Sequence, residues 1–205
     1  MVYPITCLPY GLRRRMSELA TPIERYDLQV AAGQMNICPP RLQTIRTMDT
    51  AIQFKMENSI LTVSEIMNDY QAKPFPVNED DLIFCKKSVG FVNMRSEDLE
   101  NPIFNNFKFD ITVISFSDCD ASANFYREVA AFTKTKPVHL CIFTNSTISF
   151  KDVFDAFPGT TKLSLKATLP NGWRSDLFRH QKSKSLTVFY QNGPNEGMGG
   201  FTLEK

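Results

Sequence analysis

The stretch Ile111-Thr-Val-Ile114-Ser-Phe116-Ser-Asp-Cys119 decides the fold expected for this chain of 205 residues. It has the form apolar-x-x-apolar-x-apolar-x-x-Asn/Cys. Alternate residues of a strand point to opposite faces of its sheet, so Ile114 and Phe116 are expected to share one buried face. The stretch therefore predicts a half-buried strand that ends in a turn near Cys119.

Weaker copies of the same phrase recur through the second half of the chain. They pair Val89 with Phe91, Leu140 with Ile142, Leu163 with Leu165, and Leu186 with Val188. The copies start at residues 89, 114, 140, 163 and 186, so successive starts are 25, 26, 23 and 23 residues apart. The phrase and its spacing resemble the leucine-rich repeat, whose units are about 20–29 residues long. The resemblance implies an α/β fold, a short strand–helix array whose strands are parallel and adjacent in chain order.

The segments between the copies carry helix signals. Residues 124–134 place apolar side chains at i, i+4 and i+7, and Ser149 and Asp152 have the spacing of a capping box. The helix that begins at Ser149 is expected to stop at Pro158-Gly159. A further short helix is expected after Asn171-Gly172. Unrelated strands of an ordinary α/β domain are the alternative interpretation, because short apolar runs with a period of two occur in any half-buried sheet.

Composition indicates a globular protein without a strong electrostatic field. Hydrophobic residues make up 42% of the chain, 17 residues are Phe, and the net charge is +1. That charge gives no general attraction for nucleic acid or an acidic membrane. The sequence shows neither a secretory signal pattern nor about 18 consecutive apolar residues. We expect a cytoplasmic or nuclear protein with no nucleic-acid or membrane partner.

The residues that usually carry catalysis form no recognisable motif. The chain has five cysteines without a Cys-x-x-Cys pair, and only two histidines, His139 and His180. Reduced, mostly buried thiols are the expected state, and no metal or other cofactor is predicted. Cys141 and His139 are the nearest Cys–His pair by sequence, but the pattern shows no third group to orient them. The protein is predicted not to be an enzyme.

The first 40 residues have a different character from the repeats. Apolar residues at 12, 16 and 19 mark one face of a helix, and Thr21-Pro22 predicts the cap and first residue of a second helix. With Leu8-Pro9 and the region of Leu28, this pattern resembles the F-box, the helical module that attaches substrate receptors to the adaptor subunit of SCF ubiquitin ligases. The usual Val-Ser-x-x-Trp-like ending is replaced by Ala31-Ala-Gly-Gln-Met-Asn-Ile-Cys-Pro-Pro40. The compact layout resembles the divergent, lineage-expanded F-box proteins of nematodes.

This resemblance implies a non-catalytic substrate receptor that links a protein client to an SCF-type ubiquitin ligase. A small helical module cannot bury an apolar stripe internally, so the stripe is expected to contact the adaptor. The adaptor-binding residues are predicted to be Leu8, Pro9, Leu12, Met16, Leu19 and Pro22. Packing of these helices on the repeat domain is the alternative role. The protein is expected to be a monomer outside the complex.

The client is expected to bind outward positions of the strands, because alternate strand residues face away from the helices. These positions are Ser115, Ser117, Cys141, Phe143, Ser164 and Lys166. A register slip of one residue would reverse that assignment.

The predicted domain order is an F-box-like helical module at 1–40, a hairpin and linker cap at 41–82, the array at 83–192, and a flexible tail at 193–205. A hairpin is expected on either side of Glu57-Asn58-Ser59, followed by a short helix at 64–70. Two other functions remain open: a repeat-based interaction domain without ligase binding, and a small α/β enzyme of unknown type.

Overall fold

The computed structural model describes residues 7–32, 42–69, 71–133, 137–192 and 197–204. The chain forms two compact units. Unit 1 comprises Met1–Thr47, Val77–Phe84 and Pro102–Lys108, and unit 2 comprises Met48–Pro76, Cys85–Asn101 and Phe109–Lys205. The sequence predicted one N-terminal module that ends at residue 40, whereas the chain returns to unit 1 twice after leaving it. Across the described residues the fold is mixed α/β, with five α-helices and a large sheet.

Unit 1 contains α1 (Tyr10–Leu19), α2 (Pro22–Ala32) and the 3-10 helix η3 (Pro102–Asn106). Thr21 caps α2 as expected: its Oγ1 accepts a hydrogen bond from the Glu24 backbone N–H at 3.4 Å, and the Glu24 carboxylate accepts from the Thr21 backbone N–H at 2.8 Å. This is a reciprocal capping box, and proline at the first helical position needs no backbone hydrogen bond there. The question of a third helix falls mainly on residues 33–40, which lie outside the described residues.

Three short strands form a separate sheet of order β1-β5-β7: β1 (Arg46–Met48), β5 (Ile83–Cys85) and β7 (Phe107–Phe109). The buried Asn106 precedes β7, and its side-chain amide donates to the backbone carbonyls of Asn78, Glu79 and Asp81 at 2.7–3.1 Å. These bonds join residues 78–81 to η3 within unit 1, although the two segments are more than 20 residues apart in the chain.

Unit 2 is built on a nine-stranded sheet of order β12-β11-β10-β9-β8-β6-β2-β3-β4. The strands are β2 (Ala51–Glu57), β3 (Ile60–Ile66), β4 (Ala72–Pro74), β6 (Ser88–Val92), β8 (Val113–Ser117), β9 (His139–Phe143), β10 (Lys162–Ala167), β11 (Ser185–Asn192) and β12 (Gly199–Glu204). The six strands β2, β6, β8, β9, β10 and β11 form the centre of the sheet and are parallel. From β6 to β11, neighbours in this sheet follow one another in chain order.

The register of these strands follows the recurring phrase. Val89 lies opposite Ile114, which lies opposite Leu140, and Leu140 lies opposite Leu163. The predicted order and direction of the strands are thus confirmed. The last strand differs, because Leu163 lies opposite Val188 rather than Leu186, so that the final spacing is 25 residues. A shift of two residues keeps each side chain on its expected face, since the side-chain period of a strand is two.

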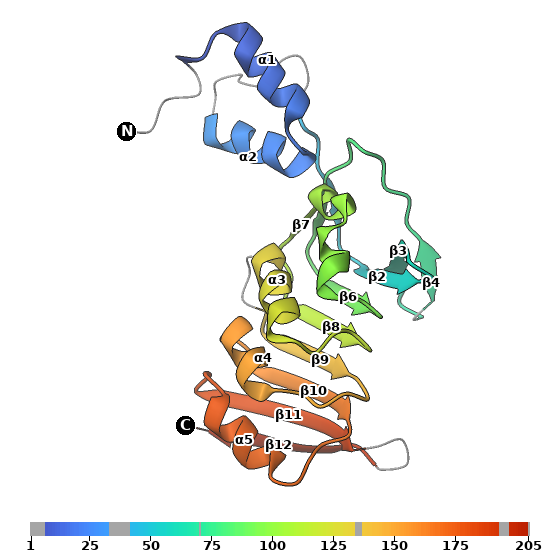
Figure 1. The fold of residues 1–205 in the computed structure, drawn as a ribbon, viewed down its shortest axis with the longest axis vertical. Coiled ribbons are helices and arrows are strands. Elements are labelled where there is room, and N and C mark those ends of the chain that lie inside the picture. The colour runs from blue at the N-terminus through green and yellow to red at the C-terminus, as the bar shows by residue number, and fades with distance from the viewer. Residues whose placement is uncertain (1–6, 33–41, 70, 134–136, 193–196, 205) are drawn as a thin grey trace. The chain divides into compact units, whose positions relative to one another are not determined.

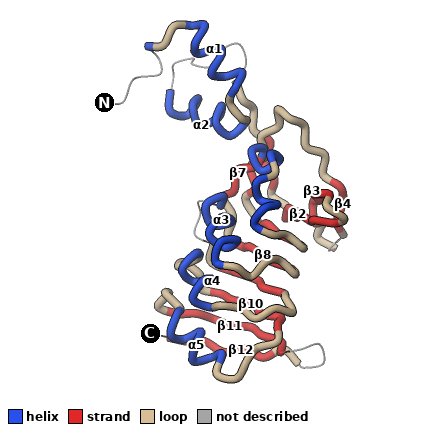
Figure 2. Tube along the Cα trace, in the orientation of Figure 1, coloured by secondary structure: helices blue, strands red, loops and turns tan. Residues whose placement is uncertain are grey.

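The segments between the parallel strands lie along one side of the sheet in chain order (Figure 1). They are the 3-10 helix η2 (Ser96–Glu100), α3 (Ala123–Thr133), α4 (Phe150–Ala156) and α5 (Trp173–His180). Figure 2 shows the resulting alternation of strand and helix from β8 to β11. Ser149 caps α4 as predicted, because its side chain accepts from the Asp152 backbone N–H. η2, α3, α4 and α5 lie on the side of the buried strand residues, and none of these four lies on the opposite face (Figure 1).

A ladder of aromatic rings fills the core beneath these helices. Phe54, Phe91 and Phe116 lie opposite one another on β2, β6 and β8, and neighbouring rings stack with centroids 5.8 and 5.9 Å apart. Phe125 of α3 meets the edge of Phe116 at 5.8 Å, and Phe157 approaches the same ring at 6.1 Å. Offset and edge-to-face pairs at these distances add to the free energy that burial alone contributes.

Two predictions about the ends of unit 2 are wrong in part. The hairpin of β2 and β3 is present, and Asn58 and Ser59 both have positive φ, as its tight turn requires. However, β3 continues to Ile66, where a helix was expected. Residues 199–204 of the predicted flexible tail form β12, antiparallel to β11. A Cβ at Gly199 would lie 2.5 Å from the Tyr190 ring, so glycine here permits close packing.

Different side chains form the hydrogen bonds at the turns after β8 and β9. Cys119 is buried, and its thiol donates to the Phe91 backbone carbonyl at 3.2 Å, which links one strand–helix unit to the preceding one. In the turn after β9, Asn145 is exposed. Thr144 holds that turn instead, because its buried Oγ1 accepts from the Ser146 backbone N–H at 3.0 Å.

Candidate functional site

Two surfaces contain the residues predicted to bind partners. The first, called the α1 face below, consists of Leu8, Leu12, Met16 and Leu19 in unit 1. The second, called the open sheet face, consists of the outward side chains of β6, β8, β9, β10 and β11 in unit 2.

The α1 face is exposed. No residue of α1 is buried, and Leu12 and Leu19 have 56% and 68% of their surface exposed. Leu8 and Met16 are half-buried, while Pro9 is exposed and provides the N-cap position of α1. Pro22, in contrast, is buried at the start of α2. It is therefore assigned to packing within the chain, and the exposed apolar surface is that of α1.

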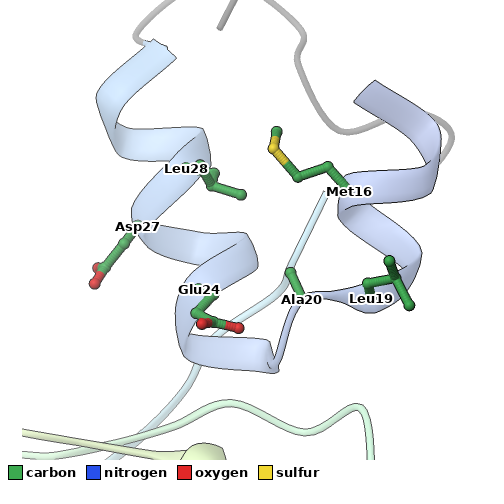
Figure 3. A pocket seen from close by; sticks show the side chains of 6 residues that line it. All are labelled: Met16, Leu19, Ala20, Glu24, Asp27 and Leu28. Atoms are coloured by element: carbon green, nitrogen blue, oxygen red, sulfur yellow. The ribbon is translucent and has the colours of Figure 1, made fainter. Parts of the chain in front are cut away.

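A shallow groove of about 530 Å³ runs between α1 and α2. Its lining residues are Met16, Leu19, Ala20, Glu24, Asp27 and Leu28. Figure 3 shows Met16 and Leu28 pointing toward each other from the two helices. Leu28 was not among the predicted adaptor-binding residues, although its position in the second helix was part of the F-box resemblance. The groove continues the apolar surface of α1 onto α2.

The charged residues of α1 lie on its solvated side. Glu18 contacts Arg14 at 2.9 Å and Arg15 at 3.4 Å, and the Arg14 guanidinium is the main reason that the pKa of Glu18 is below its ordinary value. These are exposed pairs one helical turn apart, which contribute little to stability. Arg14 and Arg15 are thus paired along the helix itself.

Contacts of α2 hold this helix in unit 1. The Arg25 guanidinium donates to the Asp80 carboxylate at 2.7 Å and to Gln43 at 3.0 Å. Lys108 contacts Asp27 at 2.6 Å, and its ammonium lies 4.8 Å from the centre of the Tyr26 ring. These contacts fix α2 by its polar side, so that its Leu28 side remains free to line the groove.

The open sheet face brings together the six residues predicted to bind a client. Ser115, Cys141 and Ser164 lie opposite one another on β8, β9 and β10. Ser117, Phe143 and Lys166 form the next row in the same way. None of these six residues is buried. The structure thus places them on one continuous surface.

Several residues of this face were not among the six predicted from the sequence. His139 and Lys162 form a third row with Val113, and Phe189 lies opposite Ser164 on β11. Each of these residues lies on the same side of the sheet as the six predicted residues. The alternation of side chains along a strand could have identified them, because every second residue of a strand faces the same side.

Cys141, His139 and Ser164 contact one another on this face. Nε2 of His139 lies 3.5 Å from the Cys141 sulfur and 2.9 Å from Ser164 Oγ. Ser164 is thus a third group that the sequence pattern did not show. It shares the nitrogen that faces the thiol, whereas a catalytic orienting group bonds to the other ring nitrogen.

The protonation states of this cluster also differ from those of a reactive pair. Burial raises the pKa of the Cys141 thiol, while burial and then the charge of Lys162 lower the pKa of His139. Both shifts favour the neutral forms at pH 7. A cysteine nucleophile requires the thiolate, which its neighbours stabilise by lowering the thiol pKa. The cluster is therefore a polar patch of the open sheet face.

No protein-family model, curated protein or solved structure matches this chain. Within the described residues, no helix has the length and apolar character needed to cross a bilayer. The same residues contain no group of three or more His, Cys, Asp and Glu side chains placed to hold a metal ion.

Proposed function

We propose that this chain is a non-catalytic substrate receptor, which binds the adaptor subunit of an SCF-type ubiquitin ligase through the α1 face. The observation that carries the proposal is the exposure of that face: α1 has no buried residue, and Leu12 and Leu19 are both more than half exposed. A contiguous apolar surface of this kind is typical of an interaction site. Its position in an F-box-like sequence makes the ligase adaptor the proposed partner.

The size of the expected effect follows from burial. Complete burial of a leucine side chain contributes about 1.5–3 kcal/mol, and Leu12 and Leu19 begin more than half exposed. Their joint burial against a partner would thus contribute about 2–4 kcal/mol. A difference of 1.4 kcal/mol changes a dissociation constant about tenfold. The loss of these two contacts alone would therefore weaken binding enough to be measured in a titration.

The unit 2 sheet supports the receptor part of the proposal. Its parallel strands follow one another with η2 and the helices on one side, which is the arrangement that a leucine-rich-repeat-like array would have. Helices cover one face and the other face is open, so a client protein has access to a row of neighbouring strands. The chain itself needs no reactive group for this role.

The proposed mechanism is tethering. The α1 face would hold the chain on the ligase while the open sheet face holds the client. A lysine of the client then meets the ubiquitin-loaded enzyme at a raised effective concentration, and the reaction is faster because it no longer depends on free encounter.

Two substitutions in α1 test the adaptor contact without disturbing the helix. Leu12→Asp puts a negative charge in the first turn of α1, and Leu19→Lys puts a positive charge at its last residue. Both charges suit the helix dipole, and the net charge of the chain stays the same. We expect the full chain to bind the purified adaptor with micromolar or tighter affinity, and the double variant to bind at least tenfold more weakly.

The matched control is Ile60→Asp with Met67→Lys in unit 2. These two apolar residues are also exposed, at 64% and 42%, and the net charge again stays the same. The control should bind the adaptor like wild type. Absence of binding by the folded wild type would contradict the ligase proposal, and would favour an interaction domain without ligase binding.

A further inference from the structure

The open sheet face carries charge of one sign. Its charged residues are Lys162 and Lys166 on β10, with the titratable His139 next to Lys162. Among the described residues, no Asp or Glu occupies an outward position on β6, β8, β9 or β10, nor at 187, 189 or 191 of β11. Acids occur at the margins of this surface, at Asp118 after β8 and Glu204 on β12. The centre of the face is therefore positively charged.

The two lysines project from a floor of small residues. A Cβ at Gly90 would lie 2.9 Å from Ser115 Oγ, so the Ser115 side chain occupies the space beside Gly90 on β6. From there, Ser115, Cys141 and Ser164 continue the row across three strands. A floor of such short side chains lets a bound backbone approach the sheet closely.

Two exposed aromatic rings stand on either side of β10. Phe143 on β9 lies opposite Lys166 and is 37% exposed. Phe189 on β11 lies opposite Ser164 and is 42% exposed. Exposed rings beside a cationic strand provide apolar contact for a bound segment while the lysines provide its charge recognition.

We propose that the open sheet face binds an extended, acidic segment of a protein, with its carboxylates on Lys162 and Lys166 and an apolar side chain against Phe143 or Phe189. The two lysines are four residues apart on one strand, which corresponds to about 13 Å. Acids four residues apart in an extended segment match this separation. The statement that this segment belongs to a ligase client rests on the proposed function, whereas the binding of an acidic segment does not.

Panning of random peptides tests the chemistry without a known client. A displayed library of nine-residue peptides is selected on the immobilised full chain and on its Lys162→Glu, Lys166→Glu variant. The control is Arg179→Glu, which reverses an exposed charge on α5, on the helix side of the sheet. All three proteins are first checked for cooperative thermal unfolding.

Wild type and the Arg179→Glu control should enrich peptides with at least two Asp or Glu residues, most often four positions apart. A fluorescein-labelled copy of the most enriched peptide should bind the Lys162→Glu, Lys166→Glu variant at least tenfold more weakly. Three results would overturn the proposal: no enrichment on wild type, enrichment without an excess of acids, or equal binding by the double variant. The assay contains no adaptor, so its outcome is independent of the adaptor titration.

Discussion

At the residue scale, Phe116 connects the strands of unit 2 with its helices. The ring is 2% exposed and contacts Phe91 of the neighbouring strand as well as Phe125, Tyr126 and Phe157. It belongs to the stretch that decides the expected fold, and its burial follows from strand alternation alone. The sequence could not specify the ring partners, because Tyr126 and Phe157 come from segments whose contacts depend on the whole packing.

Replacement of Phe116 by Ala should lower the free energy of unfolding by about 3–5 kcal/mol, because it removes a fully packed ring and leaves a cavity. Chemical denaturation monitored by circular dichroism measures the change. The matched control is Phe189→Ala on the open sheet face, where the ring is 42% exposed and the loss should be only about 1–2 kcal/mol. Equal losses for the two variants would contradict the assignment of the buried and open faces.

The second residue-scale prediction concerns His139. Its pKa is lowered by burial and by Lys162, so the folded protein binds a proton here less readily than the unfolded chain. The stabilising contribution of neutral His139 is therefore complete above about pH 6.5 and is lost as the pH falls through the lower pKa of the folded state. An NMR titration should give a midpoint below 6.5, and Lys162→Met should raise it.

The His139→Gln variant identifies the His139 resonance in that titration. The groups that face the imidazole are the Cys141 thiol, the Ser164 hydroxyl and the Lys162 ammonium, and none of them carries a negative charge in the form described. A midpoint at or above 6.5 in wild type would show that the imidazole is more solvated than its contacts indicate.

At the scale of single elements, local sequence signals located the helices well. Residues 123–133 form α3, residues 150–156 form α4, and the stop after Phe157 agrees with Pro158-Gly159. The signals succeeded because caps and apolar periodicity act within a few residues. They failed for β12, since glycines that allow close packing on Tyr190 look the same in sequence as glycines that confer flexibility.

The cap of α4 gives the prediction at this scale. Ser149→Ala removes the side-chain oxygen that accepts from the Asp152 backbone N–H, and should cost about 1 kcal/mol of stability. Urea denaturation of full-length protein measures this loss. Ser146→Ala is the control, because Ser146 is an exposed residue of the preceding loop, and it should leave the midpoint within error. A Ser149→Ala midpoint equal to wild type would exclude a stabilising cap.

At the scale of the whole molecule, the recurring phrase predicted the order and direction of the parallel strands. It could do so because each copy pairs with the next one along the chain. The return of residues 77–84 and 102–108 to unit 1 was not predictable in this way. Those contacts join segments that are far apart in the sequence, and neither segment has a periodic pattern that identifies the segment it packs against.

The candidate site was predictable to a similar degree. Strand parity placed Ser115, Cys141 and Ser164 in one row, and helix periodicity placed Leu12 and Leu19 on an exposed face. The groove lined by Leu28 required knowledge of how α1 and α2 pack, which the spacing of apolar residues does not give.

Hydrogen exchange of the full chain with and without the purified SCF adaptor subunit measures whether α1 contacts the adaptor. We expect slower amide exchange in residues 10–19 of α1 when adaptor is present, with unchanged exchange in strands β8 to β11. The Leu12→Asp, Leu19→Lys variant should lose this protection. Unchanged exchange in α1 at saturating adaptor, or protection confined to the open sheet face, would contradict the account.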